Sequence, residues 1–73
     1  MASSFSYEIT EKIAVLSEIG DTTKELNKVA YNGAAPKYDL RSWKHSDEGD
    51  KLLKGITLND EEMEVLKEAV ANL

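Results

Sequence analysis

The residues with the most distinctive chemistry lie in one short segment, residues 36–44. In an extended strand, side chains two positions apart share a face. Lys37, Arg41 and Trp43 therefore fall on one face, and Leu40 looks the other way. Two cations and an indole on one surface suit a ligand with negative charges and flat rings. Single-stranded nucleic acid has both.

The net charge of −5 argues against nucleic acid at first, because its binding proteins are usually basic. The charges are unevenly distributed, however. Residues 22–45 carry five bases and two acids (+3), whereas residues 59–73 carry five acids and one base (−4). Three of the five aromatic residues also lie within residues 22–45. A positive face is therefore compatible with a negative total.

Composition limits the other function classes. There are no cysteines and one histidine, which excludes disulfides, thiolate metal sites and an imidazole-rich metal centre. No glycine-rich phosphate loop and no nucleophile with partner residues is evident, so we expect no enzyme, cofactor or metal. The N-terminus lacks the features of a signal peptide, and no apolar run could span a bilayer. We expect a cytoplasmic protein, and nucleoid association is compatible with that.

The pattern of the chain predicts four strands followed by a helix. Strands are expected at residues 5–17, 22–32, 36–44 and 54–58. In the first, Phe5, Tyr7 and Ile9 alternate with polar residues, and a bulge is expected around residues 10–12. Turn residues separate the strands at Gly20-Asp21, in the hairpin loop 32–36 and in the polar loop 45–50.

The C-terminal residues give the clearest helical pattern. Asn59 is a good N-cap, and Glu62 occupies the capping-box position three residues later. Acidic residues crowd the first turn, where the helix dipole favours them. An apolar stripe at helical spacing then follows, which we interpret as core or dimer interface: Met63, Leu66, Val70 and Leu73. A chain of 73 residues has a marginal core, so a homodimer is expected.

The order of these motifs resembles the Positive Cofactor Four family of transcriptional coactivators. The resemblance rests on Tyr-Asp-Leu-Arg-Ser-Trp (38–43), the polar loop, Lys-Gly-Ile-Thr-Leu (54–58) and the acid-started helix. Residues 24–27, 31–33 and 36–39 extend it, and the pattern is most similar to the small bacterial branch called YdbC-like. It covers the chain from about Ile9 onward. Lys28 departs from the family pattern, which favours an apolar residue there.

The resemblance implies an α+β fold and a function. The fold is a curved, four-stranded antiparallel sheet followed by a C-terminal helix (ββββα) in a symmetric homodimer. From the length of the chain we expect residues 1–73 to form a single domain, with residues 1–4 flexible. The function is binding of single-stranded DNA with little sequence preference, in transcription regulation or in replication and repair. Arg41 would contact the DNA backbone, and Tyr31 and Trp43 would stack on bases.

Eight residues form the resulting candidate nucleic-acid-binding set. They are Lys24, Asn27, Tyr31, Lys37, Arg41, Trp43, Lys44 and Lys54.

Several alternatives remain open at this stage. Trp43 is also interpretable as a core or dimer anchor, and Arg41 as the partner of a weak surface contact with Asp39. His45, in a polar loop, is expected to be solvated. Single-stranded RNA is an alternative ligand. A different function class is a coactivator-type protein-interaction module that docks onto a transcription-machinery protein without binding nucleic acid.

Overall fold

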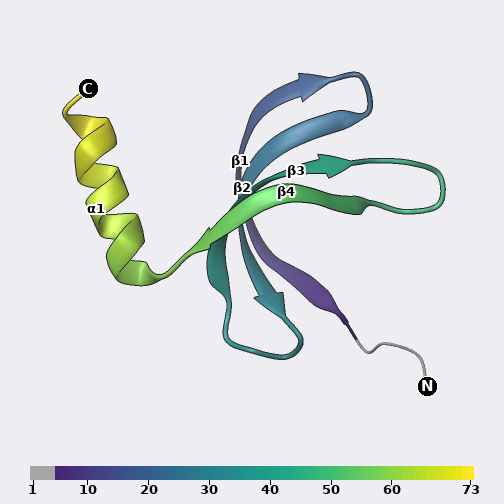
Figure 1. The fold of residues 1–73 in the computed structure, drawn as a ribbon, viewed down its shortest axis with the longest axis horizontal. Helices are drawn as coiled ribbons and strands as arrows, with labels where there is room; N and C mark the ends of the chain where they lie inside the picture. Colours follow the sequence, from purple (N-terminus) through teal and green to yellow (C-terminus); the bar gives the residue numbers. More distant parts are fainter. Residues whose placement is uncertain (1–4) are drawn as a thin grey trace.

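A computed structural model describes residues 5–73 of the protein, and the prediction that residues 1–4 are flexible lies outside the described residues. The chain forms β1 (Tyr7–Ile19), β2 (Thr22–Tyr31), β3 (Lys37–Lys44), β4 (Lys51–Leu58) and α1 (Asp60–Ala71). The strands form one antiparallel sheet in the order β1-β2-β3-β4, and α1 follows it (Figure 1). The predicted ββββα fold is confirmed.

The sheet is strongly curved because β1 is irregular. Its pairing with β2 shifts register at three places, one of them between Ile9 and Glu11, where a bulge was predicted. Each bulge bends the strand and increases its twist. Tyr7 pairs with Tyr31, and Trp43 pairs with Thr23. Tyr31 and Thr23 both belong to β2 and would lie about 26 Å apart along a flat strand. The rings of Tyr7 and Trp43 nevertheless lie 5.4 Å apart. The sheet therefore curls over one face without closing.

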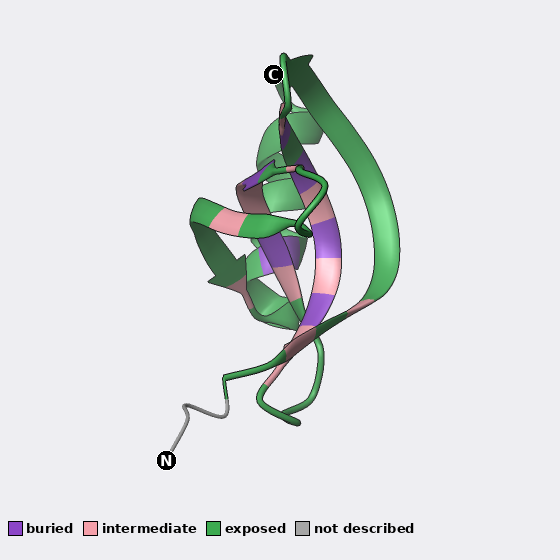
Figure 2. Ribbon diagram, turned by 90° about the vertical axis from the view of Figure 1, so that its right-hand side faces the viewer, coloured by how far each residue is buried: buried purple, intermediate pink, exposed green. Residues whose placement is uncertain are grey.

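The two faces of the sheet differ in composition and burial. One, called here the network face, carries the odd-numbered residues of β2 and β3, from Thr23 to Tyr31 and from Lys37 to Trp43. The other, the helix-side face, carries the even-numbered residues, including Leu26 and Leu40. The buried residues alternate along β2 (Figure 2). The four largest side chains that are less than 2% exposed all belong to the network face: Trp43, Val29, Asn27 and Asp39.

The predicted division of residues between the two faces of β3 is confirmed, because Tyr38 and Leu40 point to the side opposite Asp39 and Arg41. On the helix-side face, Lys28 stands opposite Tyr38, and its Nζ lies 4.8 Å from the centroid of that ring. A cation over an aromatic face is a favourable contact. This contact accommodates the lysine that departs from the family pattern.

Strand β4 is longer than the sequence pattern indicated. It begins at Lys51 and not at Lys54, since Leu52 and Lys51 continue the pairing with Trp43 and Lys44 after a register shift. Because of this shift, the apolar residues of β4 on its two sides do not follow one alternation. The sequence pattern therefore indicated only the part from Lys54 onward. The prediction of a strand confined to residues 54–58 is wrong at its start.

Helix α1 extends away from the sheet (Figure 1). Asn59 and Glu62 form the predicted capping box, with reciprocal bonds of 2.7 and 2.9 Å. Only Met63 of α1 is buried, whereas Leu66 and Val70 are exposed and line a cavity of about 430 Å³ with Leu26. Within residues 5–73, α1 falls short of the length and apolarity that a membrane span requires.

Candidate nucleic-acid interface

A buried ion pair lies at the centre of the network face. Arg41 donates from Nε and Nη2 to the Asp39 carboxylate at 2.7–3.0 Å and from Nη1 to the Leu53 carbonyl at 3.1 Å. Asp39 is 0% exposed, and the Arg41 side chain is 14% exposed. The alternative that pairs Arg41 with Asp39 is therefore confirmed as to the contact, but this is not a surface contact, because Asp39 is fully buried and Arg41 is partly buried. The hydrogen bonds with Asp39 raise the pKa of Arg41.

Tyr31 belongs to the same group of side chains. Its hydroxyl donates to Asp39 at 2.7 Å, and the Arg41 guanidinium lies 5.7 Å from its ring centroid. Burial and the hydrogen bond to Asp39 raise the pKa of Tyr31 to about 12. The protonated hydroxyl donates to Asp39 and holds the ring in place.

A second polar cluster surrounds Glu25. The Thr23 hydroxyl donates to Glu25 at 2.5 Å, and the Asn27 amide donates at 3.1 Å. Burial raises the pKa of Glu25, but these two hydrogen bonds together with the charges of Lys12 and His45 outweigh it, so the pKa is lowered. His45 Nε2 lies 2.7 Å from Thr23 Oγ1, and Nδ1 lies 2.9 Å from Asp50 Oδ1. His45 is therefore partly solvated, with a side chain 39% exposed, and both of its ring nitrogens also have polar neighbours.

Trp43 lies on the predicted face but is covered. Its exposed fraction is 1%, and the ring of Tyr7 packs on it. Its indole N–H has no acceptor among the described residues, which is an energetic cost in a buried position. In this structure the ring has the environment of a core residue and offers no face to a base. Asn27, also in the predicted set, is equally buried at 1%.

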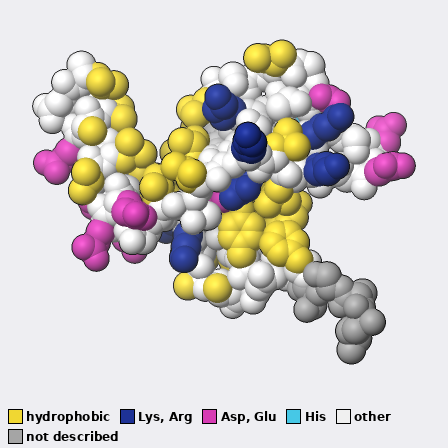
Figure 3. Space-filling model, viewed as in Figure 1, with side chains coloured by type: hydrophobic (Ala, Val, Ile, Leu, Met, Phe, Trp, Pro, Cys, Tyr) yellow, Lys and Arg dark blue, Asp and Glu magenta, His cyan; other side chains and the backbone are white. Residues whose placement is uncertain are grey.

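Three cations of the predicted set line one groove. Lys24, Arg41 and Lys54 come from three different strands and border a groove of about 700 Å³, together with Ser42, Leu53, Gly55 and Ile56. None of the described residues that line the groove is acidic. Lys and Arg side chains gather over the sheet in Figure 3, whereas the helix carries acidic side chains. The groove is therefore a positive region on a negative protein.

The groove exists because Gly55 lets two strands approach. Gly55 pairs with Arg41, and a Cβ at this position would collide with the Arg41 Cβ. Any larger residue would force β4 away from β3. The sequence could not identify this role, since it required the register of β4.

The remaining predicted residues are spread over the sheet. Lys37 is exposed at the start of β3 on the network face, and Lys44 is exposed at its end on the helix-side face. The structure thus brings Tyr31 and Arg41 together with Lys37 on one face, and Lys24 with Lys54 at the groove.

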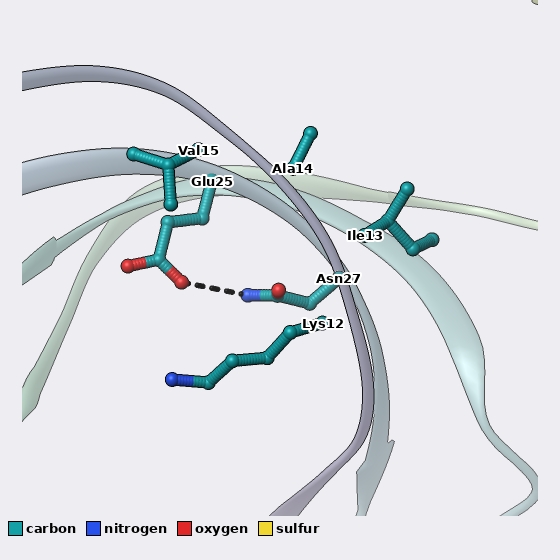
Figure 4. Close-up of a pocket in the computed structure, with 6 residues that line it drawn as sticks. All are labelled: Lys12, Ile13, Ala14, Val15, Glu25 and Asn27. Atoms are coloured by element: carbon teal, nitrogen blue, oxygen red, sulfur yellow. Dashed lines mark hydrogen bonds between the residues drawn. The ribbon is translucent and has the colours of Figure 1, made fainter.

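Sequence reasoning missed residues of β1. Lys12 lines a cavity of about 220 Å³ with Ile13, Ala14, Val15, Glu25 and Asn27, and its side chain runs beside Asn27 (Figure 4). The charge of Lys12 contributes to the lowered pKa of Glu25. Because the bulges interrupt the alternation of β1, no sequence signal assigned Lys12 to this face. Phe5, just before β1, and Tyr7 were also left out of the predicted set. Their alternation with polar residues before the first bulge indicated that they share one face.

Comparison with known proteins identifies the family of this chain. The family model described as Transcriptional Coactivator p15 (PC4) matches residues 18–69. The chain is also similar to an uncharacterized protein of Treponema pallidum (strain Nichols), with 34% identity over 70 residues, which cover 94% of this chain and 80% of that protein. The family match contains every residue that lines the groove, and it leaves out all of β1 except its last two residues.

Proposed function

Because this chain belongs to the Positive Cofactor Four family, that of transcriptional coactivator p15 (PC4), we propose that it binds single-stranded DNA with little sequence preference. The family is one of nucleic-acid-binding coactivators and not of enzymes. The proposed mechanism combines contacts to phosphates with stacking on bases. No catalytic step is involved.

The observation that carries this proposal is the groove of Lys24, Arg41 and Lys54. Three strands contribute one cation each, and no described acid lines the groove, although the chain has a net charge of −5. Asp39 already takes most of the hydrogen bonds of Arg41, so the two lysines supply the free charge. Such a local field attracts a polyanion even when the total charge is negative.

The proposal includes a homodimer in the cytoplasm. The apolar residues Leu66 and Val70 of α1 face a cavity and stay exposed in one chain. Exposed apolar surface of this kind favours association. A dimer would cover these side chains and place two grooves in one particle. The process served would be transcription regulation, or replication and repair.

The test is a titration of a fluorescently labelled oligothymidine, followed by anisotropy at several salt concentrations. Lys24→Ala and Lys54→Ala should each weaken binding and lower the salt slope, by about 0.7 for each phosphate that the variant no longer neutralises. Lys67→Ala is the matched control, because Lys67 lies on α1 and pairs with Glu64. Equal affinity and salt slope in all four proteins would refute the groove as the binding site.

A coactivator-type interaction module without nucleic-acid binding is the second candidate. It is favoured by the exposed Val65, Leu66 and Val70 of α1, which a protein partner could cover. This candidate predicts that the wild type binds no oligonucleotide, single-stranded or duplex, even at low salt. The same titration therefore separates the two.

A further inference from the structure

The start of the chain brings two further aromatic rings to the network face. Phe5 lies 6.4 Å from Tyr7 and 6.2 Å from Tyr31, measured between ring centroids. Tyr7 in turn lies 5.4 Å from Trp43. The four rings come from the two ends of the curled sheet and form one cluster, the aromatic cluster.

Exposure divides the aromatic cluster into a surface and a support. Phe5 is 58% exposed, Tyr7 and Tyr31 are half-buried, and Trp43 is 1% exposed. A base can stack only on a ring that solvent reaches. Phe5, Tyr7 and Tyr31 are at least partly accessible, whereas Trp43 lies beneath Tyr7 and is not.

The surroundings of the cluster suit a base that is attached to a phosphate. Arg41 lies 5.7 Å from the Tyr31 ring and is held by hydrogen bonds to Asp39. Lys37 is exposed, and its β-strand partner is Val29, two residues from Tyr31 on the same face. Rings next to cations are the arrangement that holds single strands without reading their sequence. In Figure 3, hydrophobic side chains lie next to the Lys and Arg side chains on the same view of the sheet.

We infer that Phe5, Tyr7 and Tyr31 form the stacking platform for unpaired nucleobases, and that Trp43 is a positioning residue beneath Tyr7. This inference rests on the proposed function and specifies which residues perform its stacking part. The occupant is a single nucleic-acid strand whose phosphates contact Arg41 and Lys37 beside the rings.

The first experiment measures the affinity of each variant for labelled oligothymidine. Phe5→Leu and Tyr7→Leu should each weaken binding by about fivefold or more, the value of one stacked base. Phe5→Tyr keeps a ring and should bind within about twofold of the wild type. Tyr38→Leu is the control, since Tyr38 is a half-buried tyrosine of the helix-side face. Phe5 is exposed, so its replacement leaves the fold intact, as circular dichroism would verify.

A second experiment identifies the stacked rings directly. An oligothymidine with one 5-iodouracil is photo-crosslinked to the wild-type protein, and the attached peptides are mapped by mass spectrometry. Crosslinks at Phe5, Tyr7 or Tyr31 support the platform. Crosslinks confined to Trp43, or unchanged affinity in both leucine variants of a wild type that binds, would overturn it. If the wild type binds no oligothymidine at all, the proposed function itself has failed.

Discussion

The network face and the helix-side face belong to the same sheet but bury very different side chains. On the network face, Asn27 and Asp39 are at most 1% exposed although both are polar. On the helix-side face and the helix next to it, the apolar Ile56 and Val70 are 57% and 56% exposed. The network face thus buries polar groups together with Val29 and Trp43, while large apolar side chains stay exposed on the other side, which departs from the usual distribution.

The cause of this difference is the curvature of the sheet. Curling brings the ends of the strands together over the network face, so this face covers itself, and its polar groups find partners within the chain. On the helix-side face, α1 contributes only Met63 as a buried side chain and leaves a cavity between Leu26 and Val70, so the helix covers only part of this face (Figure 1). The network face is therefore largely covered within a single chain, whereas apolar side chains of the helix-side face and of α1 stay exposed.

The largest effect is expected from breaking the ion pair of the network face. Asp39→Ala leaves Arg41 without its counter-charge and the Tyr31 hydroxyl without its acceptor. Removing one partner of a buried pair costs about 3–5 kcal/mol, so the free energy of unfolding should fall by this amount. Urea denaturation followed by Trp43 fluorescence measures it. Asp47→Ala, an exposed loop acid, is the control. A loss as small as that of the control would show that the network face does not depend on this pair.

Charges placed on the exposed apolar side of α1, next to the helix-side face, should weaken association and not folding. The double variant Leu66→Glu, Val70→Glu should weaken the proposed dimer by about a hundredfold or more, since it puts carboxylates into an apolar interface. The monomer should keep its fold, because both side chains are exposed in it. Sedimentation velocity over a range of concentrations measures the mass, with Glu64→Gln as control. A monomer at all concentrations in the wild type would contradict the dimer, and unfolding of the variant would contradict the contrast between the faces.

A smaller effect is expected at the close approach of β3 and β4. Gly55→Ala places a Cβ where the Arg41 Cβ already lies, so β4 must shift. Overpacking of this kind costs about 1–3 kcal/mol of unfolding free energy. Urea denaturation measures the loss, and Lys54→Ala, the exposed neighbour, shows the effect of a change without a clash. If Gly55→Ala is as stable as the wild type, the two strands are not held as closely as described.

Sequence reasoning succeeded where the strands are regular. Strand β3 alternates without interruption up to Arg41, so the faces of Leu40 and Arg41 followed from the period of two. The helix was predictable because Asn59 and Glu62 are a local signal. Each of these features depends on residues within a few positions of one another.

Sequence reasoning failed where the position of a residue depends on distant parts of the chain. The burial of Trp43 depends on Tyr7, which reaches it only because three bulges bend β1. Asp39 and Arg41 were recognised as neighbours, but the same curvature makes their contact a buried one. The alternation of a strand predicts which side a residue faces. It does not predict what lies on that side.

The smallest predicted effect concerns the link between the network face and the β3–β4 loop. His45 Nδ1 lies 2.9 Å from Asp50, and Nε2 lies 3.5 Å from Glu25, with Thr23 the other neighbour of Nε2. The hydrogen bond with Asp50, together with both negative charges, outweighs desolvation and raises the pKa of His45. The folded state therefore binds this proton more tightly than the unfolded state does.

The sign of the pH dependence follows from that difference. The stabilisation is fully present below the unfolded pKa of about 6.5 and is lost as the pH rises through the folded pKa. The wild type should thus exceed His45→Gln in Tm by more at about pH 6 than at about pH 8.5. Asp50→Asn removes the largest cause of the shift and should reduce the same pH dependence. Parallel Tm curves for the wild type and His45→Gln would mean that the protonated imidazole does not join the loop to Glu25. The polar cluster around Glu25 would then include Thr23 but not the β3–β4 loop.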